Sequence, residues 1–421
     1  MKQLTAFVLL FVLLYNPPFP VLPINLTYIV YLVGILYFLF KRRCVLLNTE
    51  VNIFLWFLLV VLWGCIITIV KGAYDFNMLG ISRFFTGWLS SMAIVSLLNS
   101  RNKMLNVYLI VKFIVIASSI QSIIILLTFI YDPAKEFLLL LFRNMPELEL
   151  EKITNLSLMR GLGWTYVQFA DFAIVQGMGL FSLISLQFMD VATILNKKKY
   201  FSIFLLLHII AGILIARTFL FLIILSVGYY FYLRSTNLKS LGMKFFIGVR
   251  IMFVVILLSI FTYNLAVQYF SKETVDWMFE AFKNYSDNGT LQTDSTEELK
   301  EYWHLPNNIF TLIFGDGRFV DDVNFNYAKS DSAYIIGIYY WGLIGSILYY
   351  TFIYKLYYYS RSQFSDTIMR SLLLVFFATI ILYNVKGIFS GLVYFCLFLE
   401  ASLVNKSKNI LSNGYNSIIH I

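Results

Sequence analysis

Apolar residues run in long stretches along the whole chain, separated by short polar segments. The hydrocarbon core of a bilayer is about 30 Å thick, so a helix needs about 20 apolar residues to cross it. About twelve stretches approach that length. They are residues 4–21, 24–40, 51–70, 79–98, 104–130, 164–187, 200–215, 218–233, 245–264, 332–354, 367–383 and 387–404. Because a helix satisfies its own backbone in lipid, the pattern predicts an all-α, polytopic membrane protein, with residues 1–421 forming one membrane domain.

Two apolar regions are too long for one crossing. Residues 200–233 are interrupted by Arg217, and residues 371–404 are interrupted by Asn384 and Lys386. A single helix of either length would reach about 50 Å at about 1.5 Å per residue, which exceeds the bilayer core. Each region is therefore predicted to be a tight hairpin of two short helices with a basic residue at its outer turn.

The composition excludes most soluble classes of protein. Hydrophobic residues make up 60% of the chain and charged residues only 13%. A soluble domain carries about 25% charged residues. This deficit excludes a soluble enzyme, a disordered protein and a nucleic-acid-binding protein. The three cysteines, Cys44, Cys65 and Cys396, lack CxxC spacing, which argues against a disulfide framework and a zinc site.

The formal net charge of +9 comes largely from loops on one side of the predicted membrane. Every second boundary between apolar stretches carries basic residues and few acids. These basic residues are Lys41, Arg42, Arg43, Arg101, Lys103, Lys197, Lys198, Lys199, Arg234, Lys239, Lys244, Arg361, Arg370, Lys406 and Lys408. Positively charged loops stay in the cytoplasm. The pattern predicts a multi-pass membrane protein with both termini cytoplasmic and no nucleic-acid partner.

Two of the outward-facing loops are long. The first covers residues 131–163, and the second covers residues 265–331, a region that resembles a small soluble subdomain. Within the second loop, residues 275–285 follow an amphipathic helix pattern, residues 295–298 form a capping box, and residues 315–317 form a glycine turn. Loops of this length in a compact protein are usually functional or disordered, and these features favour an ordered, functional loop.

Four arginines lie on the outward side of the predicted topology. Arg83 is about one turn into its helix, Arg160 ends the first outer loop, Arg217 occupies a hairpin turn, and Arg318 belongs to the second outer loop. Arginine at the rim of a membrane is costly, so it usually faces a cavity or a partner, and its planar fork of donors suits phosphate. Alternatively, each arginine snorkels to the interface or pairs with an acid. Asp171, about two turns into its helix, is a natural partner for one of them.

Several arginines around an outer-leaflet cavity suggest a lipid-anchored polyphosphate as ligand. A sugar on a lipid pyrophosphate is already activated, so no energy-coupling motif is needed, and the chain has neither a phosphate loop nor HExxH. Two or three arginines can stabilise the departing pyrophosphate, so we expect no metal and no other cofactor. A carboxylate or imidazole near the membrane surface would accept the proton of the attacking hydroxyl; the candidates are Asp331, Asp316 and His304.

Residues 314–350 resemble the end of the large outer loop and the following helix of O-antigen and capsular repeat-unit polymerases. The shared features are a G-x-G turn, a polar residue before x-x-Tyr, Gly-Leu-Ile-Gly in the helix, an arginine-containing hairpin turn, and an arginine in an earlier outer loop. In this chain they are Gly315-Asp316-Gly317, Ser330-Asp331 with Tyr334, Gly342-Leu343-Ile344-Gly345, Ala216-Arg217-Thr218, and Arg160-Gly161-Leu162-Gly163. The resemblance extends over the whole topology, with a late large outer loop.

The resemblance implies a glycosyltransferase at the outer face of the bacterial plasma membrane, acting in the synthesis of lipopolysaccharide O-antigen or of capsule. It would transfer a growing glycan from undecaprenyl pyrophosphate to another lipid-linked repeat unit. The implied partners are these two lipid-linked oligosaccharides, membrane lipid and a chain-length regulator. The implied site residues are Asp331, Arg217 and Arg318 for catalysis, Arg217, Arg160, Arg83 and Arg318 for the pyrophosphate, and His304, Asp316, Asp171 and Tyr334 for acid–base or supporting roles.

Two alternatives stay open. The first is an O-antigen ligase; that related family carries a histidine where this chain has Asp331, which favours the polymerase and leaves the proton acceptor open. The second, from a different class, is a flippase for lipid-linked oligosaccharides. Transporters usually have paired repeats, broken helices and charges near the bilayer midplane. This chain instead has its outward charges at the rim and a long outer loop.

Overall fold

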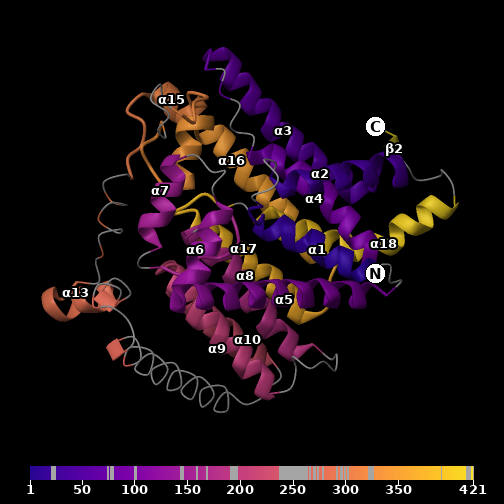
Figure 1. Ribbon diagram of the computed structural model, residues 1–421. Coiled ribbons are helices and arrows are strands. Elements are labelled where there is room, and N and C mark those ends of the chain that lie inside the picture. The colour runs from indigo at the N-terminus through magenta and orange to yellow at the C-terminus, as the bar shows by residue number, and fades with distance from the viewer. Residues whose placement is uncertain are drawn as a thin grey trace. The chain divides into compact units, whose positions relative to one another are not determined.

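The computed structural model describes most of the chain. The described ranges are residues 1–19, 25–73, 80–98, 102–142, 147–157, 160–166, 169–189, 198–236, 279–290, 303–320, 327–389, 391–413 and 419–420, with residues 75, 264, 267, 268, 272, 275, 276, 293, 297 and 300. These residues are mostly helical (Figure 1). The strands among them are β1 (Val45–Leu46) and β2 (Ile419–His420), which pair antiparallel. The predicted all-α class is confirmed.

Helices occupy almost all of the predicted apolar stretches. They are α1 (Lys2–Tyr15), α2 (Leu26–Leu36), η1 (Tyr37–Lys41), α3 (Asn48–Val70), α4 (Gly80–Leu98), α5 (Lys103–Ile130), α6 (Asp132–Leu141), α7 (Glu147–Leu156), α8 (Phe169–Phe188), α9 (Lys198–Ile215), α10 (Thr218–Thr236), α13 (Glu280–Asn288), α15 (Ile309–Phe314), α16 (Ala333–Ser362), α17 (Thr367–Tyr383) and α18 (Leu392–Asn413). The stretch 245–264 lies outside the described residues, apart from its last residue.

Five of the described helices are long and apolar enough to cross a membrane: α3, α5, α8, α10 and α16. Six shorter apolar segments, of 10–17 residues, lie in α1, in α2 with η1, and in α4, α9, α17 and α18. A chain with several helices of this length and composition is suited to span a membrane, because each helix satisfies its own backbone in lipid.

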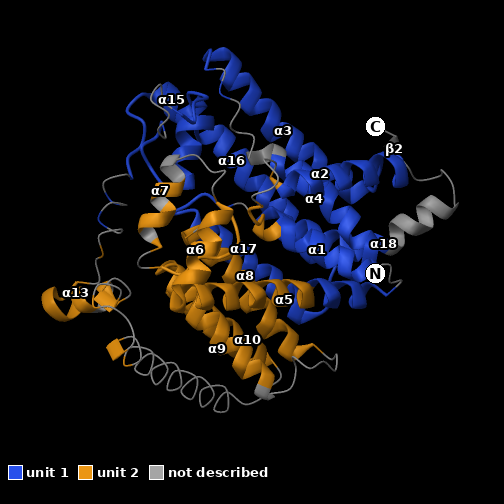
Figure 2. Cartoon of the chain, in the orientation of Figure 1, with its two compact units in different colours: residues 1–13, 26–110, 295–421 blue, residues 14–25, 111–294 orange. Residues whose placement is uncertain are grey.

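The chain divides into two compact units (Figure 2). Unit 1 comprises residues 1–13, 26–110 and 295–421, and unit 2 comprises residues 14–25 and 111–294. The predicted outer loop 265–331 is therefore divided between the units at Asp294 and Ser295. Within this loop, α13 overlaps the predicted amphipathic helix, whereas most of the predicted capping box lies outside the described residues.

In unit 1, α4 packs against α2 and α18, and α16 packs against α3, α15, α17 and α18. The packing encloses an ion cluster in which Arg42, Glu50 and Glu400 are all buried. Nη1 of Arg42 lies 2.7 Å from Oε1 of Glu50, and its Nη2 lies 3.7 Å from Oε2 of Glu400. Burial alone would lower the pKa of Arg42, but the two carboxylates outweigh it and raise that pKa. Arg42 is one of the basic residues that predict the membrane orientation. Its two ion pairs also link its own loop to α3 and α18.

A break at Gly342 shapes the end of unit 1 that holds the predicted outer loop. The apolar pattern predicts one continuous helix over residues 332–354, but α16 is interrupted at Gly342, where φ is 68° and ψ is −178°. A Cβ at this position would lie 2.2 Å from the carbonyl oxygen of Ile313, so the site requires glycine. The prediction of a continuous helix is wrong here, because an apolar run does not reveal a backbone break.

The break makes two carbonyls of α16 available to the outer loop. A helix end leaves carbonyls without intrahelical donors. The carbonyl of Tyr339 accepts the backbone N–H of Asp316 at 2.8 Å, and the carbonyl of Tyr340 accepts that of Gly317 at 3.0 Å. Gly315 and Gly317 both have positive φ, as the predicted glycine turn requires. The turn is thereby fixed on the helix, and its orientation sets the position of the Asp316 side chain.

In unit 2, α8 packs against α9 and α10, and α9 and α10 form the predicted tight hairpin. Helix α9 ends at Ile215 and α10 begins at Thr218, so Arg217 occupies the turn as the sequence predicts. The described part of the first outer loop, residues 131–163, includes α6 and α7. Its apolar side chains form a small core that contains Leu138, Phe142, Ile153 and Leu162.

Candidate functional site

The first outer loop and the α9–α10 hairpin meet at a backbone hydrogen bond. The N–H of Gly161 donates to the carbonyl of Leu214 at 3.0 Å. This bond places Arg160 beside the turn that carries Arg217. Burial and the positive charge of Arg217 lower the pKa of Arg160 to about 10, so Arg160 still carries its charge at neutral pH. The structure therefore brings together two arginines that the sequence predicts to bind the same anion.

Each of these arginines also has a protein partner. The guanidinium of Arg160 lies 5.2 Å from the centre of the Phe169 ring. Arg217 forms an ion pair with Glu280, which lies in the first turn of α13. The side chains of Arg217 and Glu280 remain 21% and 16% exposed, so a ligand can approach them from solvent. Pairing with an acid, the alternative weighed for Arg217 above, is thus present, and the group of three side chains keeps one net positive charge.

The two remaining residues predicted near these arginines differ in position. Asp171 lies in the first turn of α8, because α8 begins at Phe169; the predicted depth of about two turns is wrong. Asp171 therefore follows Phe169, whose ring packs against Arg160, by two residues. Arg83 lies in the first turn of α4, as predicted, and is exposed in unit 1.

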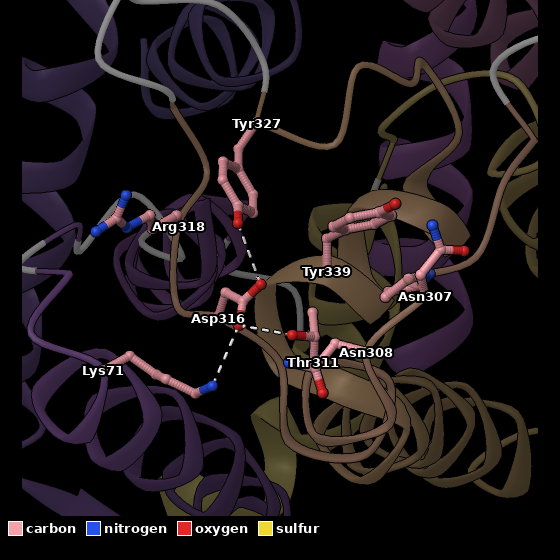
Figure 3. A pocket seen from close by; sticks show the side chains of 9 residues that line it. Lys71, Asn307, Asn308, Thr311, Asp316, Arg318, Tyr327 and Tyr339 are labelled. Carbon is pink, nitrogen blue, oxygen red and sulfur yellow. Dashed lines mark hydrogen bonds and ion pairs between the residues drawn. The ribbon is translucent and has the colours of Figure 1, made fainter.

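Unit 1 contains a polar pocket of about 530 Å³ (Figure 3). Its walls come from the end of α3, the segment leading into α15, the glycine turn and the first part of α16. The lining residues are Lys71, Pro306, Asn307, Asn308, Thr311, Asp316, Arg318, Tyr327 and Tyr339. We refer to it as the Asp316 pocket. Two residues of the predicted site, Asp316 and Arg318, meet in it.

Three donors hold the Asp316 carboxylate (Figure 3). Oδ1 accepts from Nζ of Lys71 at 3.2 Å and from Oγ1 of Thr311 at 2.9 Å, and Oδ2 accepts from the hydroxyl of Tyr327 at 3.2 Å. Burial and the nearby carboxylate raise the pKa of Tyr327, which keeps its hydroxyl protonated as a donor. With both oxygens engaged, Asp316 fixes the pocket wall, and its Oδ2, which accepts one donor, can accept another.

Arg318 has a different environment. Its side chain is exposed, and Figure 3 shows its guanidinium turned away from Asp316. Within the described part of the chain, it forms no ion pair. His304, also exposed, places its ring 5.9 Å from the Tyr339 ring, centre to centre, and so borders the same pocket wall.

Asp331 and Tyr334 lie at the start of α16. Asp331 is exposed between the buried Ser330 and Ser332, and its carboxylate has no hydrogen-bond or ion-pair partner among the described residues. The hydroxyl of Tyr334 donates to the carbonyl of Ile381 at 2.7 Å, and its ring stacks on another tyrosine. Tyr334 therefore supports the packing of α16 on α17, whereas Asp331 is free to interact with a ligand.

Sequence reasoning missed two residues of this region. Lys71 follows the predicted span 51–70 on the outward side, where basic residues are uncommon, and this sidedness was the available signal. Asp75 accepts the backbone N–H groups of Phe319 and Val320 at 2.7 and 3.0 Å. It thereby ties the loop after α3 to the glycine turn, a contact over a sequence separation that no local pattern reveals.

Comparison with protein-family models, with curated proteins and with solved structures gave no match to this chain.

Proposed function

We propose that the chain is a membrane glycosyltransferase that polymerises undecaprenyl-pyrophosphate-linked oligosaccharide repeat units at the outer face of the bacterial plasma membrane. The observation that carries the proposal is the proximity of Arg160 and Arg217, which come from separate segments and are fixed by the Gly161–Leu214 hydrogen bond. Two adjacent guanidinium groups match the charge and the oxygen geometry of a pyrophosphate. The product would be O-antigen or capsular polysaccharide.

The proposed topology has about twelve crossings with both termini in the cytoplasm. The five long apolar helices and the six shorter ones support this arrangement. In the α9–α10 hairpin, α9 has 18 residues and α10 has 19, and Arg217 lies at the turn between them. If the basic loops are cytoplasmic, this turn faces outward, where lipid-linked repeat units are polymerised.

The proposed reaction is a transfer of a glycan between two lipid carriers. A hydroxyl of the acceptor repeat unit attacks the anomeric carbon of the donor glycan, and the bond from that carbon to the pyrophosphate breaks. Undecaprenyl pyrophosphate leaves with the bonding electrons. Arg160 and Arg217 would stabilise the charge that develops on it, and we assign no metal ion to this step. Asp331 would accept the proton of the attacking hydroxyl, because its carboxylate is exposed.

The fate of lipid-linked glycans in cells lacking the chain tests this function. A polymerase defect leaves single repeat units, either on surface lipid or on undecaprenyl pyrophosphate at the outer face. A ligase defect leaves long polymer on undecaprenyl pyrophosphate, and a flippase defect traps single repeats on the cytoplasmic side. Either of the last two results would replace the proposal with the corresponding alternative. A chain-length regulator, if it is a partner, would shift polymer length without abolishing the polymer.

Asp331→Asn is expected to lower the polymerisation rate about 100-fold, because the amide cannot accept the proton. Asp316→Asn serves as the matched comparison, since its carboxylate is held by three protein donors. We expect this second change to raise KM more than it lowers kcat. Initial rates with purified variants measure both effects. A larger loss of kcat in Asp316→Asn than in Asp331→Asn would transfer the role of proton acceptor to Asp316.

A further inference from the structure

The Asp316 pocket combines polar groups of several kinds. Its lining includes two amides, a threonine hydroxyl, two tyrosines, one carboxylate and two cations, with a single proline. A pocket for a lipid tail is lined mainly by apolar side chains. Hydroxyls, amides and tyrosine rings are the groups that bind the hydroxyls and C–H faces of sugars. The lining therefore indicates a carbohydrate rather than the polyprenyl chain.

The charges in the pocket are not balanced. Lys71 lies 3.2 Å from Asp316 and neutralises it. Arg318 lines the same pocket, is exposed, and forms no ion pair with a described residue. A ligand in the pocket can thus contact one surplus guanidinium, which points away from the neutralised carboxylate. This arrangement favours a ligand with a single negative charge.

The single surplus positive charge of the pocket limits which anion fits. A phosphate monoester carries a charge of about −1.5 to −2 and a pyrophosphate about as much, so either would leave negative charge unbalanced near Asp316. A sugar carboxylate carries one charge, which Arg318 can hold with two parallel hydrogen bonds. The hydroxyls of the same sugar can donate to Asp316, which accepts only one donor at Oδ2. The pocket therefore fits an acidic sugar better than a phosphate.

We propose that the Asp316 pocket binds an acidic sugar residue, of the hexuronate class, with its carboxylate on Arg318 and its hydroxyls on Asp316 and Asn307. This inference rests on the proposed function, since it assigns the pocket to one sugar of the lipid-linked repeat unit. Lys71 and Tyr327 position Asp316, and the Tyr339 ring packs on the sugar. The site thereby contributes to the selection of the repeat unit.

Direct binding to the purified full-length protein in detergent tests this assignment. The probes are methyl glucuronide, methyl glucoside and inorganic phosphate, with affinities from titration calorimetry or ligand-observed NMR. We expect the glucuronide to bind at least about tenfold more tightly than the glucoside, because a charge-assisted, bidentate contact contributes roughly that factor. Equal affinity for the two sugars, or no binding of the glucuronide, would overturn the proposal. Tighter binding of phosphate would identify a phosphate site instead.

Two variants of Arg318 test whether this residue causes the preference for the glucuronide over the glucoside. Arg318→Gln is expected to remove the preference for the glucuronide, and Arg318→Lys to keep part of it. Arg370→Gln is the matched control, since Arg370 is exposed and does not line the pocket; it should leave the preference unchanged. An unchanged preference in Arg318→Gln would overturn the assignment. Sugar binding can be measured without polymerisation, so the two proposals can fail separately. If the protein binds the glucuronide but makes no polymer, the proposed function is refuted and the pocket assignment stands.

Discussion

Replacing Arg217 with alanine is expected to lower the polymerisation rate about 1,000-fold, which is the effect of removing one main stabiliser of a developing negative charge. Arg217 and Arg160 lie together, and the fork of Arg217 matches the oxygens of the departing pyrophosphate. Arg217→Lys keeps the charge but loses the fork, so we expect an intermediate rate. Initial rates with purified protein and lipid-linked repeat units compare the two variants with the unchanged protein.

Glu280→Gln is the control that separates binding from structure. If Arg217 served only to pair with Glu280, both variants would lose the same ion pair and behave alike. A partly exposed ion pair contributes about 1 kcal/mol or less to stability, so neither variant should unfold. We expect Glu280→Gln to retain most of the activity, since the amide keeps the shape and leaves Arg217 in place. Equal losses in the two variants would remove Arg217 from catalysis.

Gly342→Ala is expected to destabilise unit 1 by about 3 kcal/mol, because only glycine readily adopts the backbone conformation at this break. The added Cβ would also lie 2.2 Å from the carbonyl oxygen of Ile313. Relieving this clash requires α16 to straighten or α15 to move. Either movement would release the glycine turn and displace Asp316, so we expect the loss of glucuronide binding together with a lower thermal unfolding midpoint.

Gly228→Ala provides the comparison for this change. Gly228 lies inside α10, and a Cβ built there meets no described atom within 4 Å. Alanine favours a helix over glycine by about 1 kcal/mol, so Gly228→Ala should leave the unfolding midpoint unchanged or raise it. If Gly342→Ala were equally well tolerated, the break in α16 would not be what holds the pocket. Both variants can be compared by thermal unfolding in the same detergent.

The helices and the arginine pair could be predicted from the sequence for a common physical reason. Membrane helices are defined by the composition of single segments, and the hairpin turn follows from one charged residue, Arg217, between two apolar runs. The sequence groups Arg160 and Arg217 as candidate anion ligands because both are predicted to face outward, and the structure shows that the two lie near each other. Such properties depend on local sequence, and the structure agrees with them in α9, α10 and the first outer loop.

The features that the sequence could not reveal depend on distant parts of the chain. At the break at Gly342, α15 packs closely on α16 and the glycine turn donates to carbonyls of α16. An isolated glycine in an apolar run does not reveal these contacts. Lys71 becomes part of the Asp316 pocket only once α3 packs on α16. Arg42 belongs to a basic loop, yet the two carboxylates that form ion pairs with it come from α3 and α18.

Polymerisation by the purified protein in lipid vesicles tests the central claim most directly. The vesicles contain undecaprenyl-pyrophosphate-linked repeat units as both donor and acceptor, and the products are separated by glycan length. We expect glycans of two or more repeats, with one undecaprenyl pyrophosphate released per bond formed. Recovery of single repeat units alone, from protein that is folded and inserted, would contradict the proposed function.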